Sequence, residues 1–320
     1  MQRLRFYSIE LGLILLLLGA VGFFGYLSYG LLPANNATLT FSGKRAFTYA
    51  KRQLDFGARP TGTEANRQTG KWLIDELTRQ QWEVLIQPIT LTNNIVARNI
   101  IAVRSNSAAN APVALLTTHY DTRLFADADA SAANQILATP GANRGASGVA
   151  VLLELARTLN VEASQHTVCM VFLDAEENGN INGWEAHWGA TYFLRYLEEG
   201  VPPSKCSKPR MAVAVDMVGN TPLQVAIERN SHTGLSAAIW QVAAEQKYGD
   251  KLINQAKSAV DDVQLLFAKA GIPATLLTDY DYPQRYTMAD TLDKLNAESL
   301  EAVGRTLELW LEQGAHFQIE

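Results

Sequence analysis

The chain has 320 residues, of which 48% are hydrophobic and 18% charged, so it can bury a large core as one domain rather than two. Its formal net charge is -5, and no basic run is long enough to hold a phosphate backbone, which argues against a nucleic-acid partner. The two cysteines, Cys169 and Cys206, are too few for a disulfide framework or a zinc ribbon, and they form either one bridge or none.

The first predicted element is a membrane anchor. Residues 11–32, LGLILLLLGAVGFFGYLSYGLL, carry no charge, and about 20 apolar residues suffice to cross the hydrocarbon core of a bilayer. A cleaved signal peptide has a shorter apolar region of roughly 7–15 residues, followed by a cleavage site of small residues. We therefore expect a single, uncleaved transmembrane helix over residues 11–32.

The basic residues around this span predict its orientation. Arg3 and Arg5 precede the span, and the next basic residues are Lys44 and Arg45, so the positive-inside rule places the N-terminus in the cytoplasm. The main domain then lies outside the cytoplasm, in a periplasm or another extracytoplasmic space. The predicted organisation is a cytoplasmic N-terminus at 1–10, the anchor at 11–32, a linker at 33–42 and an α/β domain at 43–320.

The rest of the chain alternates apolar, strand-like runs with amphipathic, helical stretches. Strands buried on both faces predict an α/β domain with a twisted, largely parallel central sheet and helices on both faces. A long loop at 122–141 is of the kind that is usually functional or mobile. In chain order, the predicted helices are 43–56, 63–81, 146–159, 184–197 and 233–247, the predicted strands are 83–89, 97–104, 113–121, 167–173, 211–218 and 223–227, and 261–270, 273–278 and 297–312 continue the alternation.

Polar side chains follow three of the predicted strands. His119 and Asp121 end one strand, Glu176 and Glu177 follow another, and Asp216 follows a third. The carboxyl ends of parallel strands form the usual ligand crevice of such a sheet, so we expect these five residues to converge. At ~5 Å and an effective dielectric constant of about 20, each pair of carboxylates repels by on the order of 3 kcal/mol. A cation is therefore expected among them.

Eight stretches of the chain match a known family, and the resemblance extends over nearly all of residues 41–313. The chain resembles the zinc aminopeptidases and glutaminyl cyclases of peptidase clan MH, metallopeptidase family twenty-eight, and especially the cyclase-like branch. The matching stretches are GARPTGTEAN, TTHYDTR, PGANRGASGVAVLLELAR, FLDAEENG, WGATYFL, AVDMVGN, DDVQLLFAKAGIPATLLTDYDYP and TMADTLDKL. The resemblance implies a zinc-exopeptidase-like fold with one or two zinc ions.

The resemblance also implies roles for the residues at the strand ends. His119 and Asp216 would bind the first metal, and Glu177 would bind the second. Glu176 would act as general base on a metal-bound water, and Asp121 would orient His119 from behind.

Three positions depart from the family pattern in this same crevice. Arg144 stands in GANRGASG where relatives have an aspartate that bridges two metals, and Tyr286 stands where they have a zinc histidine. Relatives of the cyclase branch often have Asp-Asp-His where this chain has Asp261, Asp262 and Val263. Asp261 is kept as a candidate site residue that hydrogen-bonds a ligand. Zinc is usually held by three or four ligands, so the remaining set predicts no tight zinc site.

Arg144 provides the cation that the carboxylates require. A guanidinium stays protonated and has no lone pair for a metal, so it repels zinc and pairs with carboxylates. We expect Arg144 to reach Glu177, Asp216 or both. One positive charge does not match two zinc ions, so one of the two adjacent glutamates is expected to keep a raised pKa.

Three functions are consistent with these residues. The first is a membrane-anchored, non-catalytic relative of the zinc hydrolases that needs no cofactor and binds peptide N-termini or a membrane protein complex. The second is an active aminopeptidase or glutaminyl-peptide cyclotransferase with one weak zinc ion, completed by water, His187 or Tyr286. The third is a structural subunit of a membrane complex, for which the anchor matters more than the crevice.

Overall fold

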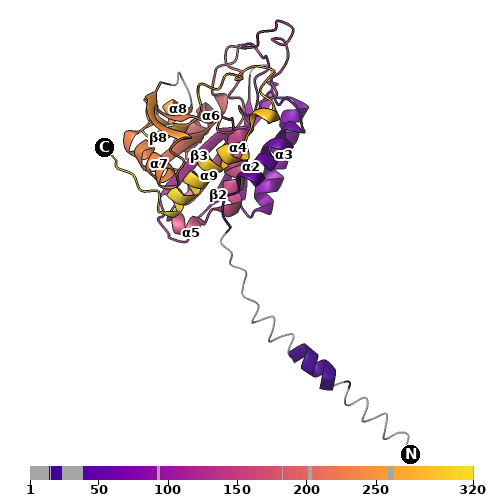
Figure 1. The fold of residues 1–320 in the computed structure, drawn as a ribbon, viewed down its shortest axis with the longest axis vertical. Coiled ribbons are helices and arrows are strands. Elements are labelled where there is room, and N and C mark those ends of the chain that lie inside the picture. The colour runs from indigo at the N-terminus through magenta and orange to yellow at the C-terminus, as the bar shows by residue number, and fades with distance from the viewer. Residues whose placement is uncertain are drawn as a thin grey trace, which may run out of the picture. The chain divides into compact units, whose positions relative to one another are not determined.

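The computed structural model describes residues 14, 16–23, 39–91, 94–181, 183–200, 204–258 and 263–319 (Figure 1). The chain divides into two compact units, Met1–Leu39 and Thr40–Glu320. Most of the predicted anchor at 11–32, all of the predicted cytoplasmic segment 1–10 and most of the linker lie outside the described residues. Within the described part of the chain, no helix is both long enough and apolar enough to span a bilayer.

The second unit is built on a six-stranded sheet with the strand order β1-β2-β4-β3-β5-β8. The pairs β3/β4, β3/β5 and β5/β8 are parallel, whereas β1/β2 and β2/β4 are antiparallel. The sheet is therefore mixed, with its parallel half around β3. Only residues 91–95 connect β1 to β2, which is enough for a hairpin but not for a parallel crossover. The strands are β1 Glu83–Thr90, β2 Val96–Arg104, β3 Val113–His119, β4 Thr167–Leu173, β5 Met211–Val215 and β8 Ala274–Leu277.

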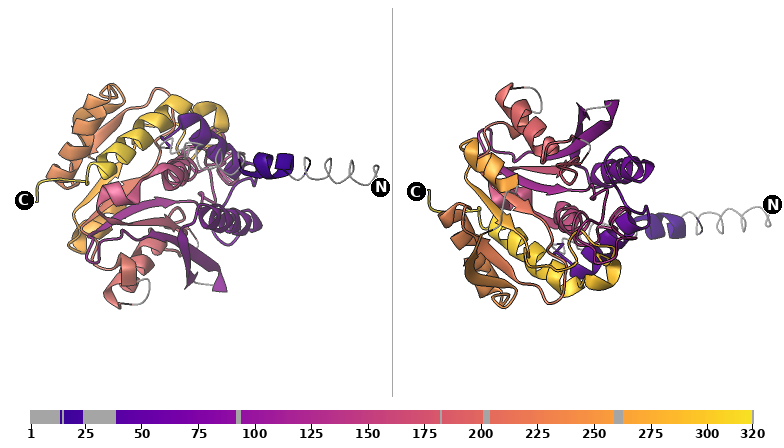
Figure 2. Two further views of the ribbon diagram at one scale, coloured as in Figure 1. Left: turned by 90° about the horizontal axis from the view of Figure 1, so that it is seen from below. Right: turned by 90° about the horizontal axis from the view of Figure 1, so that it is seen from above.

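Helices cover both faces of this sheet, as predicted. Helices α2, α4 and α9 pack against one another on one face, and α6 and α8 lie on the other. Figure 2 shows α9, in yellow, on one side of the sheet and α6 on the other. The helices are α2 Gly43–Leu54, α3 Glu64–Arg79, α4 Ser147–Thr158, α5 Val161–Ser164, α6 Trp188–Glu198, α7 Thr233–Glu245, α8 Val263–Lys269 and α9 Ala297–Glu312.

Alternate residues of the central strands supply two separate cores. On β3, Leu116 belongs to the core under α4 and α9, and its neighbour Leu115 belongs to the core under α6 and α8. On β4, Met170 and Cys169 divide in the same way. Burial on both faces explains why the sequence of these strands is almost continuously apolar.

Several predicted boundaries are wrong by a few residues. The helix predicted at 184–197 begins only at Trp188, because His187 has a left-handed backbone with φ of 57° that an α-helix interior does not contain. The strand predicted at 113–121 ends at His119, and the one predicted at 211–218 ends at Val215. A strand that the sequence did not predict, β7 Leu252–Lys257, pairs in parallel with β6 Val225–Glu228.

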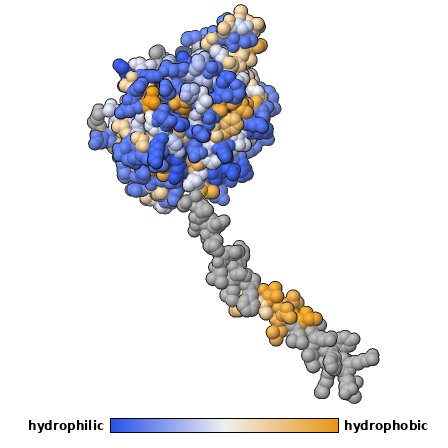
Figure 3. Space-filling model, viewed as in Figure 1, coloured by the Kyte–Doolittle hydropathy of each residue, from blue (hydrophilic) through white to orange (hydrophobic). Residues whose placement is uncertain are grey.

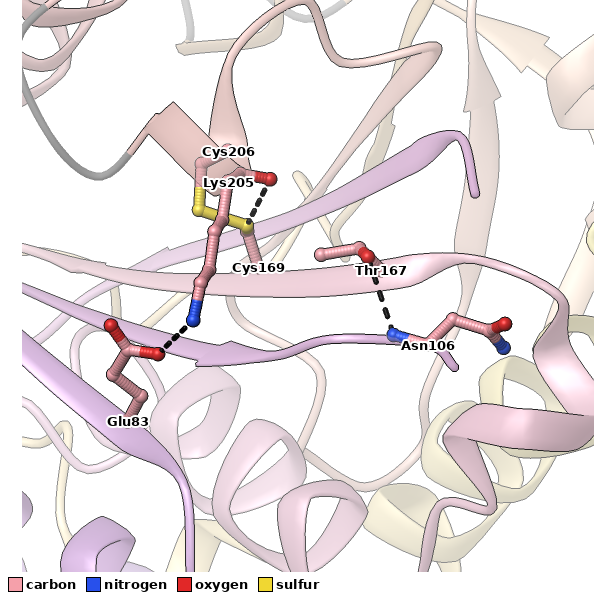
Figure 4. The surroundings of a disulfide bond; sticks show 6 residues. All are labelled: Glu83, Asn106, Thr167, Cys169, Lys205 and Cys206. Atoms are coloured by element: carbon pink, nitrogen blue, oxygen red, sulfur yellow. Dashed lines mark hydrogen bonds and ion pairs between the residues drawn. A yellow bond between two sulfur atoms is a disulfide. The ribbon is translucent and has the colours of Figure 1, made fainter. Parts of the chain in front are cut away.

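A disulfide joins Cys169 of β4 to Cys206 of the short helix η2 Ser204–Cys206, with their Cα atoms 5.9 Å apart. The sequence left open whether the two cysteines form one bridge or none, and the structure has the bridge. Figure 4 shows that the bridge lies beside Lys205, whose Nζ is 2.6 Å from a carboxylate oxygen of Glu83. The bridge thus ties the loop before β5 to the centre of the sheet.

Surface hydropathy differs between the two units. The described helical residues 16–23 are coloured as hydrophobic in Figure 3, and most of their large side chains are exposed. The visible face of the second unit is mainly hydrophilic, with separate hydrophobic patches. Ile136 and Leu137 of the long loop at 122–141 are among its exposed apolar side chains.

Candidate functional site

The parallel half of the sheet brings the predicted strand-end residues together. His119 is the last residue of β3, Glu176 and Glu177 follow β4, and Asp216 follows β5. The Nε2 atom of His119 lies 3.3 Å from Oδ1 of Asp216 and 3.7 Å from Oε1 of Glu177. All of these side chains line one pocket and are buried. The predicted convergence at the carboxyl edge of the sheet is confirmed.

Asp121 lies behind this cluster and organises the adjacent turn. Its Oδ2 accepts hydrogen bonds from the backbone N–H groups of Glu176, at 3.1 Å, and Glu177, at 3.0 Å. Its Oδ1 is 3.5 Å from Nδ1 of His119, which is closer, at 3.1 Å, to the backbone carbonyl oxygen of Asp121. Asp121 therefore positions both the imidazole and the two glutamates.

Arg144 enters the cluster from the turn before α4. Its Nε donates to Oε2 of Glu177 at 2.6 Å, and its Nη1 donates to Oδ2 of Asp216 at 2.9 Å. The prediction that this guanidinium reaches the two carboxylates is confirmed. The turn requires glycine at Gly145, which has φ of 102° and whose added Cβ would lie 2.7 Å from the backbone oxygen of Asp121.

The charges of this cluster support one another. Burial alone would lower the pKa of Arg144, but Glu177 and Asp216 outweigh it and hold that pKa well above the ordinary value. Burial alone would raise the pKa of Glu177 and of Asp216, but Arg144 and His119 outweigh it and lower both. Burial would lower the pKa of His119, but Glu177 and Asp216 outweigh it and raise that pKa well above its ordinary value. The expectation of a raised carboxyl pKa is therefore wrong for Glu177, because the cations of Arg144 and His119 both contact it.

The raised carboxyl pKa values lie just outside the cluster. Burial raises the pKa of Asp174 to about 6, with the charge of Asp121 adding to the effect. Burial also raises the pKa of Asp290 to about 6, although the backbone N–H groups of Asn143 and Arg144 donate to its carboxylate and oppose the shift.

Glu176, the expected general base, is held by two donors. Its Oε1 accepts from the backbone N–H of Ala190 at 2.7 Å, and its Oε2 lies 2.9 Å from Nδ1 of His187. Gly189 permits this approach, since a Cβ there would lie 2.8 Å from Oε1 of Glu176. His187, which the sequence singled out as a substitute ligand, also lines the pocket, and there it contacts Glu176.

Besides Arg144, two positions depart from the family pattern, Tyr286 and Val263, and they lie in different places. Tyr286 stacks on Arg144, whose Cζ is 4.9 Å from the ring centroid. Val263 begins α8 and lines the pocket. Asp261 lies outside the described residues. The open space left between the pocket side chains is about 20 Å³, which holds little more than one water molecule.

Sequence reasoning missed three residues that build the site. Arg59 donates to the backbone oxygens of Gly141 and Pro140 and so holds the loop before Arg144. Asp290 receives the N–H groups of the turn, and Arg123 donates to the backbone oxygen of Glu177 at 2.7 Å. Each of these three residues lies inside one of the stretches that resemble the family. Their position in those stretches is the sequence signal that could have identified them.

The donor set does not fit a zinc ion. His119, Glu177 and Asp216 would supply the minimum of three ligands that a tight site needs only if both carboxylates were free. Arg144 occupies one oxygen of each carboxylate and places a positive charge where the metal would lie. Within the described ranges, His, Cys, Asp and Glu side chains form no group of three or more suited to a metal ion.

Comparison with known proteins places this geometry in context. Residues 99–311 match peptidase family M28. The chain is similar to a Zn-dependent exopeptidase from Parabacteroides distasonis, with a TM-score of 0.75 and 26% identity over 86% of this chain and 99% of that one. It is also similar to the glutaminyl cyclase of Porphyromonas gingivalis, with a TM-score of 0.75 and 28% identity over 85% of this chain and 98% of that one.

Among curated proteins, the chain is similar to the aminopeptidase YwaD of Bacillus subtilis. The two are 25% identical over 240 residues, which are 72% of this chain and 47% of the aminopeptidase. The chain thus spans about half the length of that relative.

Proposed function

The chain belongs to peptidase family M28, and from that premise we propose that it is a non-catalytic member that binds a peptide or a partner membrane protein. One observation carries the proposal. The guanidinium of Arg144 bonds to Glu177 and Asp216 at 2.6 and 2.9 Å, in the space between the side chains that the resemblance assigns to metal. A fixed cation there keeps the buried carboxylates paired without an inorganic ion.

The test uses the full-length chain purified in mild detergent. We expect far less than one zinc ion per chain by elemental analysis, and no chelator-sensitive release of N-terminal residues from aminoacyl substrates. We also expect no cyclisation of peptides that begin with glutamine. Stoichiometric zinc together with either activity would overturn the proposal.

A reverse variant tests the assignment of positions. Arg144→Asp, Tyr286→His and Val263→His together restore the residue types that relatives have at these places. We expect the triple variant to bind zinc, because it removes the guanidinium and adds one carboxylate and two imidazoles. The matched control is Arg144→Asp alone, which adds only one ligand and is expected to bind zinc more weakly. A folded triple variant that takes up no zinc would contradict the assignment.

A second candidate function is an active enzyme with one weak metal ion. The contact between Glu176 and His187, at 2.9 Å, favours it, because this carboxylate is the general base of the pattern and the imidazole is a possible ligand. If activity is found, His187→Ala should abolish it together with metal binding. Activity that survives this change would exclude His187 as the substitute.

The proposal includes a membrane anchor at residues 11–32 and an extracytoplasmic main domain. It is supported by the uncharged apolar segment and by the Cys169–Cys206 bridge, since disulfides persist in oxidising compartments. A reporter fused after residue 320 tests the orientation. Alkaline phosphatase should be active and a cytoplasm-dependent fluorescent protein dark, and the opposite result would place the domain in the cytoplasm.

A role as a structural subunit predicts a stable partner. Co-purification from mild detergent should recover the chain in a complex of defined composition. Recovery only as a free monomer would leave peptide binding as the role.

A further inference from the structure

The residue before Tyr286 is an arginine that makes no ion pair with a carboxylate of the described residues. Arg285 precedes Tyr286, and its Cζ lies 4.4 Å from the ring centroid of Tyr280 and 5.4 Å from that of Tyr286. Across the ranges that the structure describes, no carboxylate lies within ion-pair distance of Arg285. Two aromatic rings therefore hold this guanidinium while its charge stays uncompensated.

The other two guanidiniums beside Tyr286 are compensated. Arg144 pairs with Glu177 and Asp216, as described above. Arg123 lies 4.9 Å from the Tyr286 ring centroid and donates through Nε and Nη2 to the carboxylate of Asp127. The charge available to a ligand at this ring is therefore that of Arg285.

Arg144 adds hydrogen-bond donors at the same ring. Its Nε and Nη1 donate to the two carboxylates, and Nη1 also contacts the sulfur of Met217 at 3.6 Å. Its Nη2 has no acceptor in the part of the chain that the structure describes. The guanidinium carbons of Arg144 and Arg285 lie 4.9 and 5.4 Å from the Tyr286 centroid, so both cations contact the same ring.

We propose that Arg285, Tyr286 and Nη2 of Arg144 form a binding site for the carboxylate of a peptide or protein ligand. The inference rests on the proposed non-catalytic function, because an aminopeptidase or glutaminyl cyclase acts on the free amino terminus of a peptide. The cation of Arg285 repels a protonated amino terminus and attracts an anion. The planar fork of arginine matches the two oxygens of a carboxylate.

The test measures binding of four versions of one short peptide to the full-length chain in detergent. The N-terminus is free or acetylated, and the C-terminus is a carboxylate or an amide. We expect both peptides with a C-terminal carboxylate to bind, whatever their N-terminus. A fifth peptide, blocked at both ends but carrying one glutamate, distinguishes an acidic side chain from a chain terminus as the source of the carboxylate.

Variants locate the site. Arg285→Gln should weaken carboxylate binding by about tenfold or more, because a charge-assisted hydrogen bond is lost. Arg285→Lys keeps the positive charge but not the planar fork of donors, so it should weaken binding less than Arg285→Gln. The matched control is Arg229→Gln, which removes an exposed arginine beyond β6. Equal losses from Arg285→Gln and Arg229→Gln would mean a non-specific charge effect and would overturn the site.

Other outcomes also decide the inference. Preference for the free amine, equal binding of amidated and carboxylate peptides, or no binding up to millimolar peptide would each overturn it. Inorganic phosphate serves as a competitor, and displacement by phosphate but not by acetate would assign the site to a phosphate group instead. Zinc content and hydrolysis are measured separately, so a metal-loaded, active chain would refute the proposed function whatever the carboxylate result.

Discussion

Two arginines with little exposed surface contact the chain before α4 in different electrostatic environments: Arg144 belongs to the turn before α4, and Arg59 donates to the backbone of residues 140 and 141. Arg59 is fully buried and donates to four backbone oxygens, those of Tyr120, Gly57, Pro140 and Gly141. Burial lowers its pKa to about 10. Arg144 donates instead to two carboxylates, which raise its pKa.

The difference shows that an arginine with little exposed surface can either hold the backbone or compensate charge. Carbonyl oxygens offer Arg59 hydrogen bonds but no full negative charge, so its role is to shape the loops. Glu177 and Asp216 offer Arg144 two full charges, so its role is to compensate the anions of the crevice. Variants at the two positions should therefore differ in how their effects respond to pH.

Arg59→Met should have the largest effect. It leaves four backbone oxygens without their donor, and buried acceptors of this kind cost about 1–3 kcal/mol each. We expect a loss of about 5 kcal/mol in the free energy of unfolding, measured by urea denaturation with tryptophan fluorescence. Because carbonyl groups do not titrate, this part of the loss is independent of pH. A loss below about 1 kcal/mol would mean that water replaces the guanidinium.

Arg144→Met should destabilise by about 3–4 kcal/mol at pH 7.5, because it leaves Glu177 and Asp216 buried without their counter-ion. In the parent chain, the pKa values of both carboxyls are lowered, so their contribution is present above about pH 4 and is lost as the pH falls further. In the variant, their pKa values should rise above the unfolded values.

The difference between the parent and Arg144→Met should therefore shrink as the pH falls from 7.5 to 4.5, as the carboxyls of the variant take up protons. Urea denaturation across this range measures the change. A difference that stays constant with pH would mean that Arg144 acts by packing rather than by charge.

Asp290→Asn should have a smaller effect that appears mainly in the pH profile. Asp290 has a folded pKa of about 6 against an unfolded value of about 3.9, so its charged form is disfavoured in the folded chain. The stability of the parent should rise as the pH falls from 7 to 5, by at most about 1.4 kcal/mol per pH unit for this group. The variant should lose that slope. Asp174→Asn is the matched comparison, since its pKa is also about 6.

Arg144→Lys should have the smallest effect, about 1 kcal/mol. Lysine keeps the positive charge but cannot donate to Glu177 and Asp216 through a rigid fork. Urea denaturation of both variants at pH 7.5 compares their losses of stability. The difference between the two losses measures the contribution of the positive charge. If the two variants lose the same stability, hydrogen-bond geometry matters more than charge.

The amino-acid sequence was sufficient to predict the α/β class and the partners of Arg144. The buried strands are apolar runs, and polar residues directly follow β3, β4 and β5, so each signal is local in the chain. Parallel strands then bring such ends together at one edge of the sheet. The requirement that buried carboxylates have a counter-ion was enough to pair Arg144 with Glu177 and Asp216.

Only the tertiary structure decided which other groups support the site. The bonds from Asn143 and Arg144 to Asp290 join residues 147 and 146 positions apart, and no periodic pattern encodes such a contact. The contact of His187 with Glu176 depends on a left-handed backbone at His187, which the helical pattern did not predict. The Cys169–Cys206 bridge likewise depends on how η2 packs against β4. Such contacts arise from packing of elements distant in the chain, whereas the sequence pattern reports mainly which residues each element buries.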